Sequence, residues 1–288
     1  MQNPAVIVLF VASILWGLTW LPLKFLHEQG FHGIALTFYV YLVLLAMMLP
    51  WLWRQRQHLL SDWRMLLAVA LLGGGAQLAF NTALIYGEVI RVMVLFYLVP
   101  LWGVLGGRIF LKERIDGMRW LGVGLSIVGA FLVVGGMNAW IAPPSWIDVI
   151  ALLSGFLFAM NNIAFRLSPN VSVYSKLAFM FIGAVVLSSL FIFIGDEPSW
   201  QVEVTSQAWL YLALYAAIWM LAANLGTQWA VTHMEAGRSS IIVIFELVTA
   251  VVSASIILGE TMSPNEMVGG ILIVLAAFLE ARREQACT

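Results

Sequence analysis

The sequence predicts an all-α membrane protein of ten transmembrane helices, arranged as two inverted five-helix repeats. Three observations predict this fold: an apolar composition, recurring apolar runs of about 20 residues, and a second half that repeats features of the first. Of 288 residues, 62% are hydrophobic and 10% are charged, whereas soluble domains have about 45–50% and about 25%. The mean hydropathy is +0.96. So few charges exclude a soluble fold, whose surface must face water.

Ten apolar runs have the length that a helix needs to cross a bilayer. A hydrocarbon core of about 30 Å takes roughly 20 helical residues, and backbone polar groups in lipid must be satisfied within each helix. The expected spans are residues 4–26, 33–53, 65–87, 89–110, 118–137, 146–166, 173–195, 207–230, 238–258 and 264–281. The connections between them are too short for a soluble domain. Residues 1–140 would form the first repeat and residues 141–288 the second.

The basic residues support this topology. With a cytoplasmic N-terminus, 12 of the 14 Lys and Arg residues fall on the cytoplasmic side, as the positive-inside rule requires. These are Arg54, Arg56, Arg64, Arg108, Lys112, Arg114, Arg119, Arg166, Lys176, Arg238, Arg282 and Arg283. Only Lys24 and Arg91 fall toward the other side. Both termini are therefore expected in the cytoplasm.

The repeat appears when the sequence is aligned with itself at an offset of 147 residues. Gln77-Leu78-Ala79 then meets Asn224-Leu225-Gly226, and Glu113 meets Glu260. Asn81 meets Gln228, Glu88 meets Glu235, Arg91 meets Arg238 and Gly122 meets Gly269. At an offset of 142, Leu15-Trp16-Gly17 meets Leu157-Phe158-Ala159. Five spans per repeat force opposite orientations in the membrane. Inverted repeats of this kind are typical of secondary transporters that bind substrate near the midplane.

Glu246 is the first candidate for a substrate contact, because it lies inside the ninth span. A charged side chain at membrane depth is costly and usually serves a function. It would be a counter-charge for a cationic group of the substrate or a proton carrier. The structural alternative is a protonated acid hydrogen-bonded to a neighbouring helix.

Amide side chains form a second set of candidates. Gln77 and Asn81 are four residues apart and share one helix face, as do Asn224 and Gln228. They would either line a cavity or join helices by hydrogen bonds. Asn161 and Asn162 complete the polar set, and one of the two is expected to face the interior.

Aromatic residues and prolines provide the remaining candidates. Trp16 and Trp20 are too deep for an interfacial belt, so they either pack the core or form an apolar cavity wall with Tyr97. Pro22 and Pro100 interrupt spans and should kink them, which can serve gating. The glycine-rich fifth and tenth spans are assigned to helix packing or a weak homodimer face, and a monomer is the alternative.

Taken together, these residues resemble a known family. Leu15-Trp16-Gly17, the Pro100 span leading into Leu111-Lys112-Glu113-Arg114, and its echo Leu258-Gly259-Glu260-Thr261 resemble the EamA-type branch of the drug/metabolite transporter superfamily. The resemblance covers nearly the whole chain. It implies a ten-span exporter of the bacterial inner membrane, similar to YddG-like exporters of amino acids and other metabolites. The implied central cavity uses the first, third, fourth, sixth, eighth and ninth spans.

The expected function is export of small metabolites, most of all aromatic or other apolar amino acids, by alternating access. The alternative is a proton-coupled exporter of drugs or other cationic compounds, with Glu246 as proton carrier. The lack of a nucleophile–base or metal-ligand set argues against an enzyme. No metal, cofactor or nucleic acid is expected, since the single cysteine and four histidines form no ligand cluster and the net charge is −1.

Overall fold

The computed structural model describes residues 4–59, 62–112, 116–135, 144–195, 204–233 and 236–286. The regular structure of these residues is helical. The helices are α1 (Pro4–Gly17), α2 (Trp20–Glu28), α3 (Gly33–Leu59), α4 (Trp63–Tyr86), α5 (Val89–Phe96), α6 (Val99–Phe110), α7 (Gly117–Val133), α8 (Trp146–Leu167), α9 (Val173–Ile194), α10 (Ser206–Leu214), the π-helix η2 (Tyr215–Met220), α11 (Leu221–Thr232), α12 (Ala236–Leu258) and α13 (Pro264–Ala286).

These helices group into ten membrane segments. Seven segments of the described chain are long and apolar enough to cross a bilayer, and three shorter apolar helices complete the set: Gly117–Val133, Ile242–Leu258 and Pro264–Leu279. The predicted all-helical membrane fold is therefore confirmed. The proposed division of the chain at residue 140 lies outside the described residues and stays a prediction.

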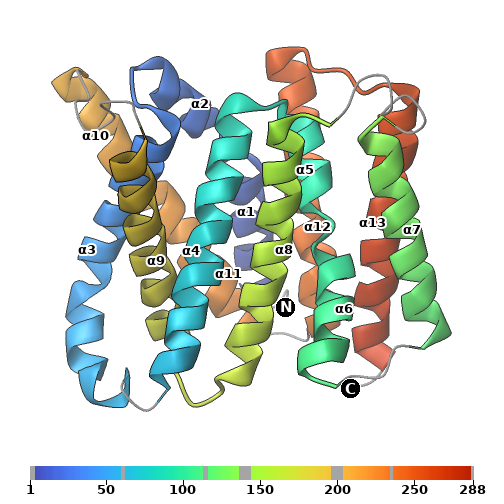
Figure 1. Ribbon diagram of the computed structural model, residues 1–288, viewed down its shortest axis with the longest axis horizontal. Helices are drawn as coiled ribbons and strands as arrows, with labels where there is room; N and C mark the ends of the chain where they lie inside the picture. The colour runs from blue at the N-terminus through green and yellow to red at the C-terminus, as the bar shows by residue number, and fades with distance from the viewer. Residues whose placement is uncertain are drawn as a thin grey trace.

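The segments run up and down the molecule side by side (Figure 1). We call the end where α2 finishes and α5, α8 and α13 begin the upper face, and the opposite end the lower face. The central helix α4 packs against α8 and α9, while α3 covers α9 at one edge and α7 pairs with α13 at the other. The apolar residues of these contacts form one large core.

Glycines allow α7 and α13 to pack closely, as their sequences predict. A Cβ atom on Gly129 would lie 2.7 Å from the carbonyl oxygen of Gly269, and one on Gly269 would lie 2.5 Å from that of Gly129. Only residues without a side chain permit this approach. These glycines thus serve packing within the chain, and a weak homodimer through the same two helices stays a prediction.

Three segments expected as single helices are interrupted. The first segment is α1 and α2 with a turn at Leu18 and Thr19, and the fourth is α5 and α6 with a turn at Tyr97 and Leu98. The eighth contains η2, a π-helix, which is often found at functional sites. The repeat-equivalent segments α8 and α12 run without a break. The two halves therefore share their order of segments but differ at the midplane.

Candidate functional site

Two helix breaks near the middle of the membrane form the frame of the candidate site. Pro22 is the third residue of α2, and Pro100 is the second residue of α6. Proline has no N–H to donate to the fourth preceding carbonyl, so each ring interrupts the hydrogen bonds of its helix. Gly155 of α8 packs against the Phe96 carbonyl that Pro100 leaves without its usual donor, since a Cβ on Gly155 would lie 2.6 Å from that oxygen.

Glu246 of α12 lies against both breaks. Gly17, the last residue of α1, packs on the Glu246 main chain. At the other break, the Tyr97 hydroxyl lies beside the Glu246 carboxyl and donates a 2.8 Å hydrogen bond to the Val243 carbonyl. The Glu246 residue is only 9% exposed. None of the basic side chains that the structure describes forms an ion pair with it.

Trp16 and Trp20 fix the first segment against the second repeat. The Trp16 indole donates to Thr227 Oγ1 of α11 over 3.2 Å, and the Trp20 indole donates to Ser253 Oγ of α12 over 3.1 Å. Ser253 lies two turns above Glu246 on α12. The Trp20 indole thus lies against the helix that carries the acid, and the Trp16 indole lies against α11. We call Gly17, Trp16, Trp20, Tyr97 and Glu246 the Glu246 site.

The first amide pair belongs to a different cluster. The Tyr41 hydroxyl of α3 donates to Gln77 Oε1 over 2.6 Å, and Asn81 Nδ2 donates to Thr37 Oγ1 over 3.4 Å. Tyr41 also lies near Tyr215 of the π-helix. The structure therefore places Gln77 and Asn81 in hydrogen bonds that join α4 to α3, rather than in contact with Glu246.

In the second amide pair and in the asparagine pair, one residue is buried and the other is at least partly exposed. Asn224 is buried and donates to the Met220 carbonyl of its own segment over 2.8 Å, whereas Gln228 is partly exposed. Asn161 is buried in the packing of α8 on α4, next to Gly73. Asn162 is exposed. The residues that accept or donate bonds to fixed partners are thus Gln77, Asn81 and Asn224.

Asn162 is exposed on the interior face of α8. It follows Phe158 by four residues and therefore shares its face, and Phe158 packs on Phe96 with ring centroids 5.6 Å apart. The lipid-facing exposed residues Val149, Leu153 and Phe156 lie on another face of α8. Asn162 therefore borders open space inside the bundle, in its lower half.

Gly103 of α6 also has open space beside it. No heavy atom lies within 4 Å of a Cβ placed on Gly103, while its repeat mate Ala250, in the upper half of α12, is 0% exposed. The two repeat-equivalent positions therefore differ in packing, with free space beside Gly103 and none beside Ala250.

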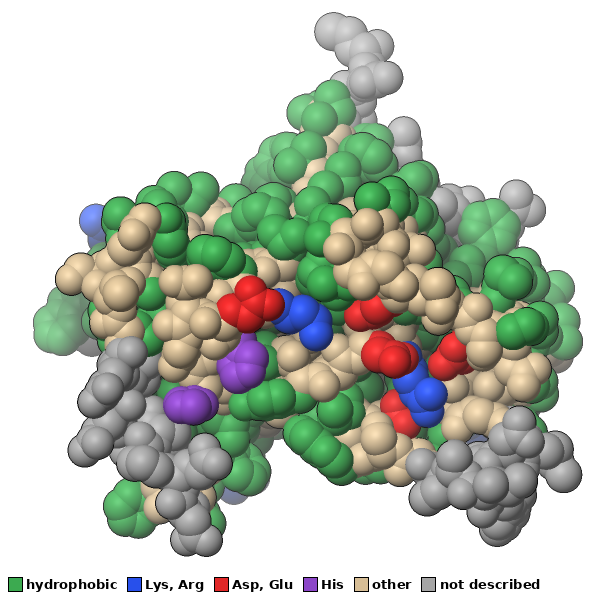
Figure 2. Space-filling view, turned by 90° about the horizontal axis from the view of Figure 1, so that it is seen from above, with side chains coloured by type: hydrophobic (Ala, Val, Ile, Leu, Met, Phe, Trp, Pro, Cys, Tyr) green, Lys and Arg blue, Asp and Glu red, His purple; other side chains and the backbone are tan. Residues whose placement is uncertain are grey.

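The upper face carries a group of charged residues (Figure 2). We call Lys24, Arg91, Asp148, Glu260 and Glu266 the upper charge cluster. Arg91 forms a two-bond ion pair with Asp148, over 2.7 and 2.8 Å, and a longer contact of 3.4 Å with Glu266. A pocket of about 300 Å³ lies between the start of α5 and the loop from α12 to α13, lined by Arg91, Glu260 and Glu266.

Lys24 and Glu260 hold the corner between α4 and α5 from opposite sides. Lys24 Nζ donates to the carbonyls of Ile85 and Gly87 over 3.3 and 2.9 Å. The Glu260 carboxylate accepts from the amides of Val89 and Ile90, both over 2.9 Å. Lys24 thus caps a helix C-terminus, where a cation is favourable.

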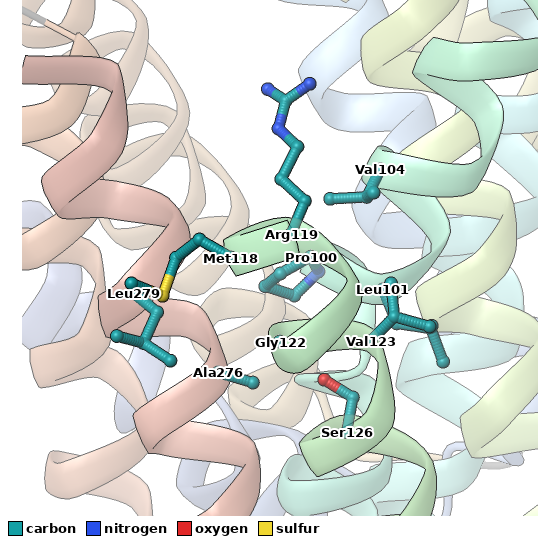
Figure 3. A pocket seen from close by; sticks show the side chains of 10 residues that line it. All are labelled: Pro100, Leu101, Val104, Met118, Arg119, Gly122, Val123, Ser126, Ala276 and Leu279. Atoms are coloured by element: carbon teal, nitrogen blue, oxygen red, sulfur yellow. The ribbon is translucent and has the colours of Figure 1, made fainter. Parts of the chain in front are cut away.

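A small crevice lies between α6, α7 and α13, and it is no substrate site. Figure 3 shows Pro100 and Leu101 of α6, Gly122 and Ser126 of α7, and Ala276 of α13 around it. Its free volume of about 10 Å³ is about that of one water molecule. Among the described residues, no three His, Cys, Asp or Glu side chains could hold a metal ion.

Sequence reasoning missed several partners in these groups. Asp148, Glu266, Tyr41, Ser253 and Thr227 were not singled out, although all five are tied to candidates or to charged residues. The sequence contained a signal for Asp148, because Ser145 and Asp148 form a capping box at the start of α8. The partner of Arg91 is set only by tertiary packing, which no local pattern contains.

These features define the class of the protein: a multi-span membrane transporter with two repeated halves. Residues 3–135 match the EamA-like transporter family, and residues 145–281 match it a second time. The chain therefore belongs to the EamA-like transporter family, whose members are transporters.

Curated relatives are similar at low identity. Protein RarD of Salmonella typhimurium (strain LT2) is 25% identical over 203 residues, which are 67% of this chain and 66% of that protein. Protein RarD of Salmonella typhi is 27% identical over 166 residues, 55% of this chain and 53% of that protein. The chain thus spans just under two thirds of the first relative and about half of the second.

A solved crystal structure of another protein shares the fold. It matches with a TM-score of 0.65 over 99% of this chain and 100% of its own, at 16% sequence identity. At this identity the likeness shows the fold alone.

Proposed function

We propose that this transporter exports small zwitterionic metabolites, most of all apolar or aromatic amino acids, and that Glu246 binds their ammonium group. The observation that carries the proposal is the position of Glu246. It is a buried acid near the middle of α12, ten residues from the start of the helix or about 15 Å along its axis. It lies between two helix breaks and forms no ion pair with a described residue. A buried carboxylate without a resident cation is costly, so a bound cation would stabilise it.

The surroundings of Glu246 suit an amino acid with an apolar side chain. Tyr97, Trp16 and Trp20 offer aromatic faces, which attract both apolar groups and ammonium groups. The Leu101 amide at the start of α6 donates to no backbone oxygen in the described structure. A free amide at a half-helix N-terminus is a suitable donor for a substrate carboxylate. Together with Glu246 it supports a zwitterion over a simple cation.

The remaining amide candidates would act nearer the two ends of the path. Asn162 and Gln228 are at least partly exposed and are proposed to line the lower half. Gln77, Asn81, Asn161 and Asn224 are buried, and we propose that they reach substrate only when the helices around them move apart. Pro22 and Pro100 would keep the breaks flexible for this change.

The direction of export rests on the charge distribution. With the lower face in the cytoplasm, as the positive-inside rule favours, export would carry substrate from the lower face to the upper face. Both termini would then be cytoplasmic, and the protein would lie in a bacterial inner membrane.

A second candidate function is proton-driven export of cationic compounds. It is supported by the same acid, because a buried carboxyl without a basic partner can carry a proton through the membrane. In that case Glu246 would exchange its proton for a cationic substrate, and no donor for a carboxylate would be needed.

Binding of matched ligands to the purified protein distinguishes the two functions. Phenylalanine, phenethylamine and 3-phenylpropionate share one ring and differ in their charged groups. The proposal predicts saturable binding of phenylalanine, at least tenfold weaker binding of the other two, since each lacks one charged contact, and loss of phenylalanine binding in Glu246→Gln. Binding of phenethylamine equal to that of phenylalanine would favour the exporter of cations. Equal phenylalanine binding by wild type and Glu246→Gln would refute the role of the acid.

A further inference from the structure

Two irregular membrane segments of opposite repeats meet inside the bundle. The eighth segment contains the π-helix η2 (Tyr215–Met220), and the first segment is interrupted at Leu18 and Thr19. Both irregularities lie within apolar spans, where no water satisfies a free backbone group. The proposed contact between Glu246 and substrate uses the break in the first segment but not η2, so the π-helix needs an explanation of its own.

The break leaves the Leu15 carbonyl without its usual backbone donor. In a regular helix the Thr19 amide would donate to it, but that amide donates to the Trp16 carbonyl over 3.1 Å, and the described structure shows no other backbone amide bonded to Leu15. Two side chains donate instead, the Thr19 hydroxyl and the Trp219 indole of η2, both over 3.0 Å. The π-helix of the second repeat thus satisfies a backbone group that the break in the first repeat sets free.

A second residue of η2 lies at the same break. Tyr215 is 5% exposed, and its hydroxyl lies beside Thr19, which is 0% exposed. Tyr215 and Trp219 are four residues apart, which is about one turn, and both side chains face the first segment. The contact between the two irregularities therefore extends over one turn of η2 and over residues 15–19 of the first segment.

The equivalent pair of segments in the other half contains neither irregularity. At an offset of 147 the repeat mates of η2 are residues 68–73 of α4, and at an offset of 142 the mate of Thr19 is Asn161 of α8. Both α4 and α8 are regular α-helices at these positions. They pack closely there, since a Cβ on Gly73 would lie 2.7 Å from Asn161 Oδ1. The break and the π-helix thus occur together in one pair, and the other pair is regular in both members, which indicates that each irregularity depends on the other.

We propose that η2 and the break in the first segment form one coupled hinge between the repeats, in which Trp219 is a positioning residue. Its indole holds the Leu15 carbonyl in the broken geometry, and Leu15 in turn fixes the two residues that follow it, Trp16 and Gly17. Both belong to the Glu246 site, so the effect of the hinge on binding rests on the proposed function. The hinge itself needs no substrate.

Hydrogen–deuterium exchange of the purified protein without substrate tests whether the coupling acts in both directions. Trp219→Phe keeps an aromatic ring but loses the donor, so the exchange rate of residues 18–23 should rise about two- to tenfold, the effect of one hydrogen bond. Thr19→Val should raise the exchange rate of residues 215–220 by a similar factor. Thr19→Ser keeps the hydroxyl and should leave both regions as in wild type.

Trp209→Phe is the control for the loss of an indole in the same segment. Trp209 packs against Phe31 and Tyr39, away from the break. This variant should leave the exchange rate of residues 18–23 unchanged, even if it lowers the melting temperature. A purely structural role of Trp219 would make the two tryptophan variants alike.

A double-mutant cycle on thermal unfolding distinguishes a coupled hinge from two independent bonds. The Leu15 carbonyl keeps one donor in Thr19→Val or Trp219→Phe and has none when the two changes are combined, and a buried carbonyl without a donor is costly. The fall in melting temperature should therefore exceed the sum of the two single falls. Thr82→Val is the matched control, because the Thr82 hydroxyl donates to the Leu78 carbonyl over 2.7 Å within the unbroken helix α4. Its effect should add to that of Trp219→Phe.

Two results would overturn the proposal: exchange that changes only in the segment that carries the substitution, or additive falls in melting temperature for Thr19→Val and Trp219→Phe. If Trp219→Phe does not fold, the response of residues 215–220 to Thr19→Val still decides the question. None of these measurements uses a substrate, so failure here leaves the amino-acid assignment standing, and failure of that assignment leaves these readouts unaffected.

Discussion

Gly17 of α1 and Glu246 of α12 touch through their main chains. A Cβ atom on Gly17 would lie 2.5 Å from the Glu246 carbonyl oxygen and 2.7 Å from Thr249 Cβ. No side chain fits in this space. Since α1 ends at Gly17, the contact fixes the break in the first membrane segment directly against the acid.

Gly17→Ala is expected to push α1 away from α12, lowering both thermal stability and transport. Overpacking of a tight interface costs about 1–3 kcal/mol. Thermal unfolding in detergent and flux in liposomes measure the two effects. Gly124→Ala is the matched control, because a Cβ on Gly124 meets nothing within 4 Å and alanine favours the helix. Equal melting temperatures for the two variants would show that the Gly17 contact is not tight.

Tyr97→Phe is expected to weaken substrate binding while the protein stays folded. The change removes the hydroxyl that lies beside Glu246 and leaves the Val243 carbonyl without its 2.8 Å donor. Loss of a hydrogen bond to a charged group costs about 1.5–3 kcal/mol, and the Glu246 carboxyl would lose its contact with Tyr97, so KM should rise roughly ten- to a hundredfold. Tyr174→Phe is the control. Tyr174 lies at the start of α9 and packs against Trp51, so this variant should behave as wild type. A KM for Tyr97→Phe within twofold of wild type would remove Tyr97 from the site.

Asp148→Asn is expected to destabilise the fold more than Glu266→Gln. The Asp148 side chain is 3% exposed and receives two short bonds from Arg91, whereas the Glu266 side chain is 20% exposed and its contact is 3.4 Å. Removing one partner of a buried ion pair costs about 3–5 kcal/mol, while exposed pairs contribute about 0–1 kcal/mol. Thermal unfolding of both variants checks this order, and the reverse order would contradict it.

The sequence was sufficient for the membrane fold, because span length and apolar composition depend on local stretches of chain. It also singled out Glu246 and Tyr97 as candidates, and the structure brings their side chains together. It did not predict the complete turns before Pro22 and Pro100. A proline indicates a weak point in a helix, but packing of the surrounding segments decides how far the helix opens.

Partners across the bundle were the least predictable feature. Gln77 bonds to Tyr41 and Trp20 bonds to Ser253, and neither pair has a local signature. Lys24 was expected only to fall toward the non-cytoplasmic side, and the structure shows that it caps the end of α4. Such contacts depend on the rotation of each helix about its axis, which hydropathy does not determine.

Flux through Glu246→Gln tests the central claim most directly. Purified protein in liposomes would take up labelled phenylalanine, with and without a pH gradient, for wild type, Glu246→Gln and the exposed control Glu28→Gln. The account predicts saturable flux for wild type and Glu28→Gln and its loss in Glu246→Gln. A response of the wild-type flux to the gradient would add a proton to the transported species. Saturable flux in Glu246→Gln, with the rate and KM of wild type, would contradict the account.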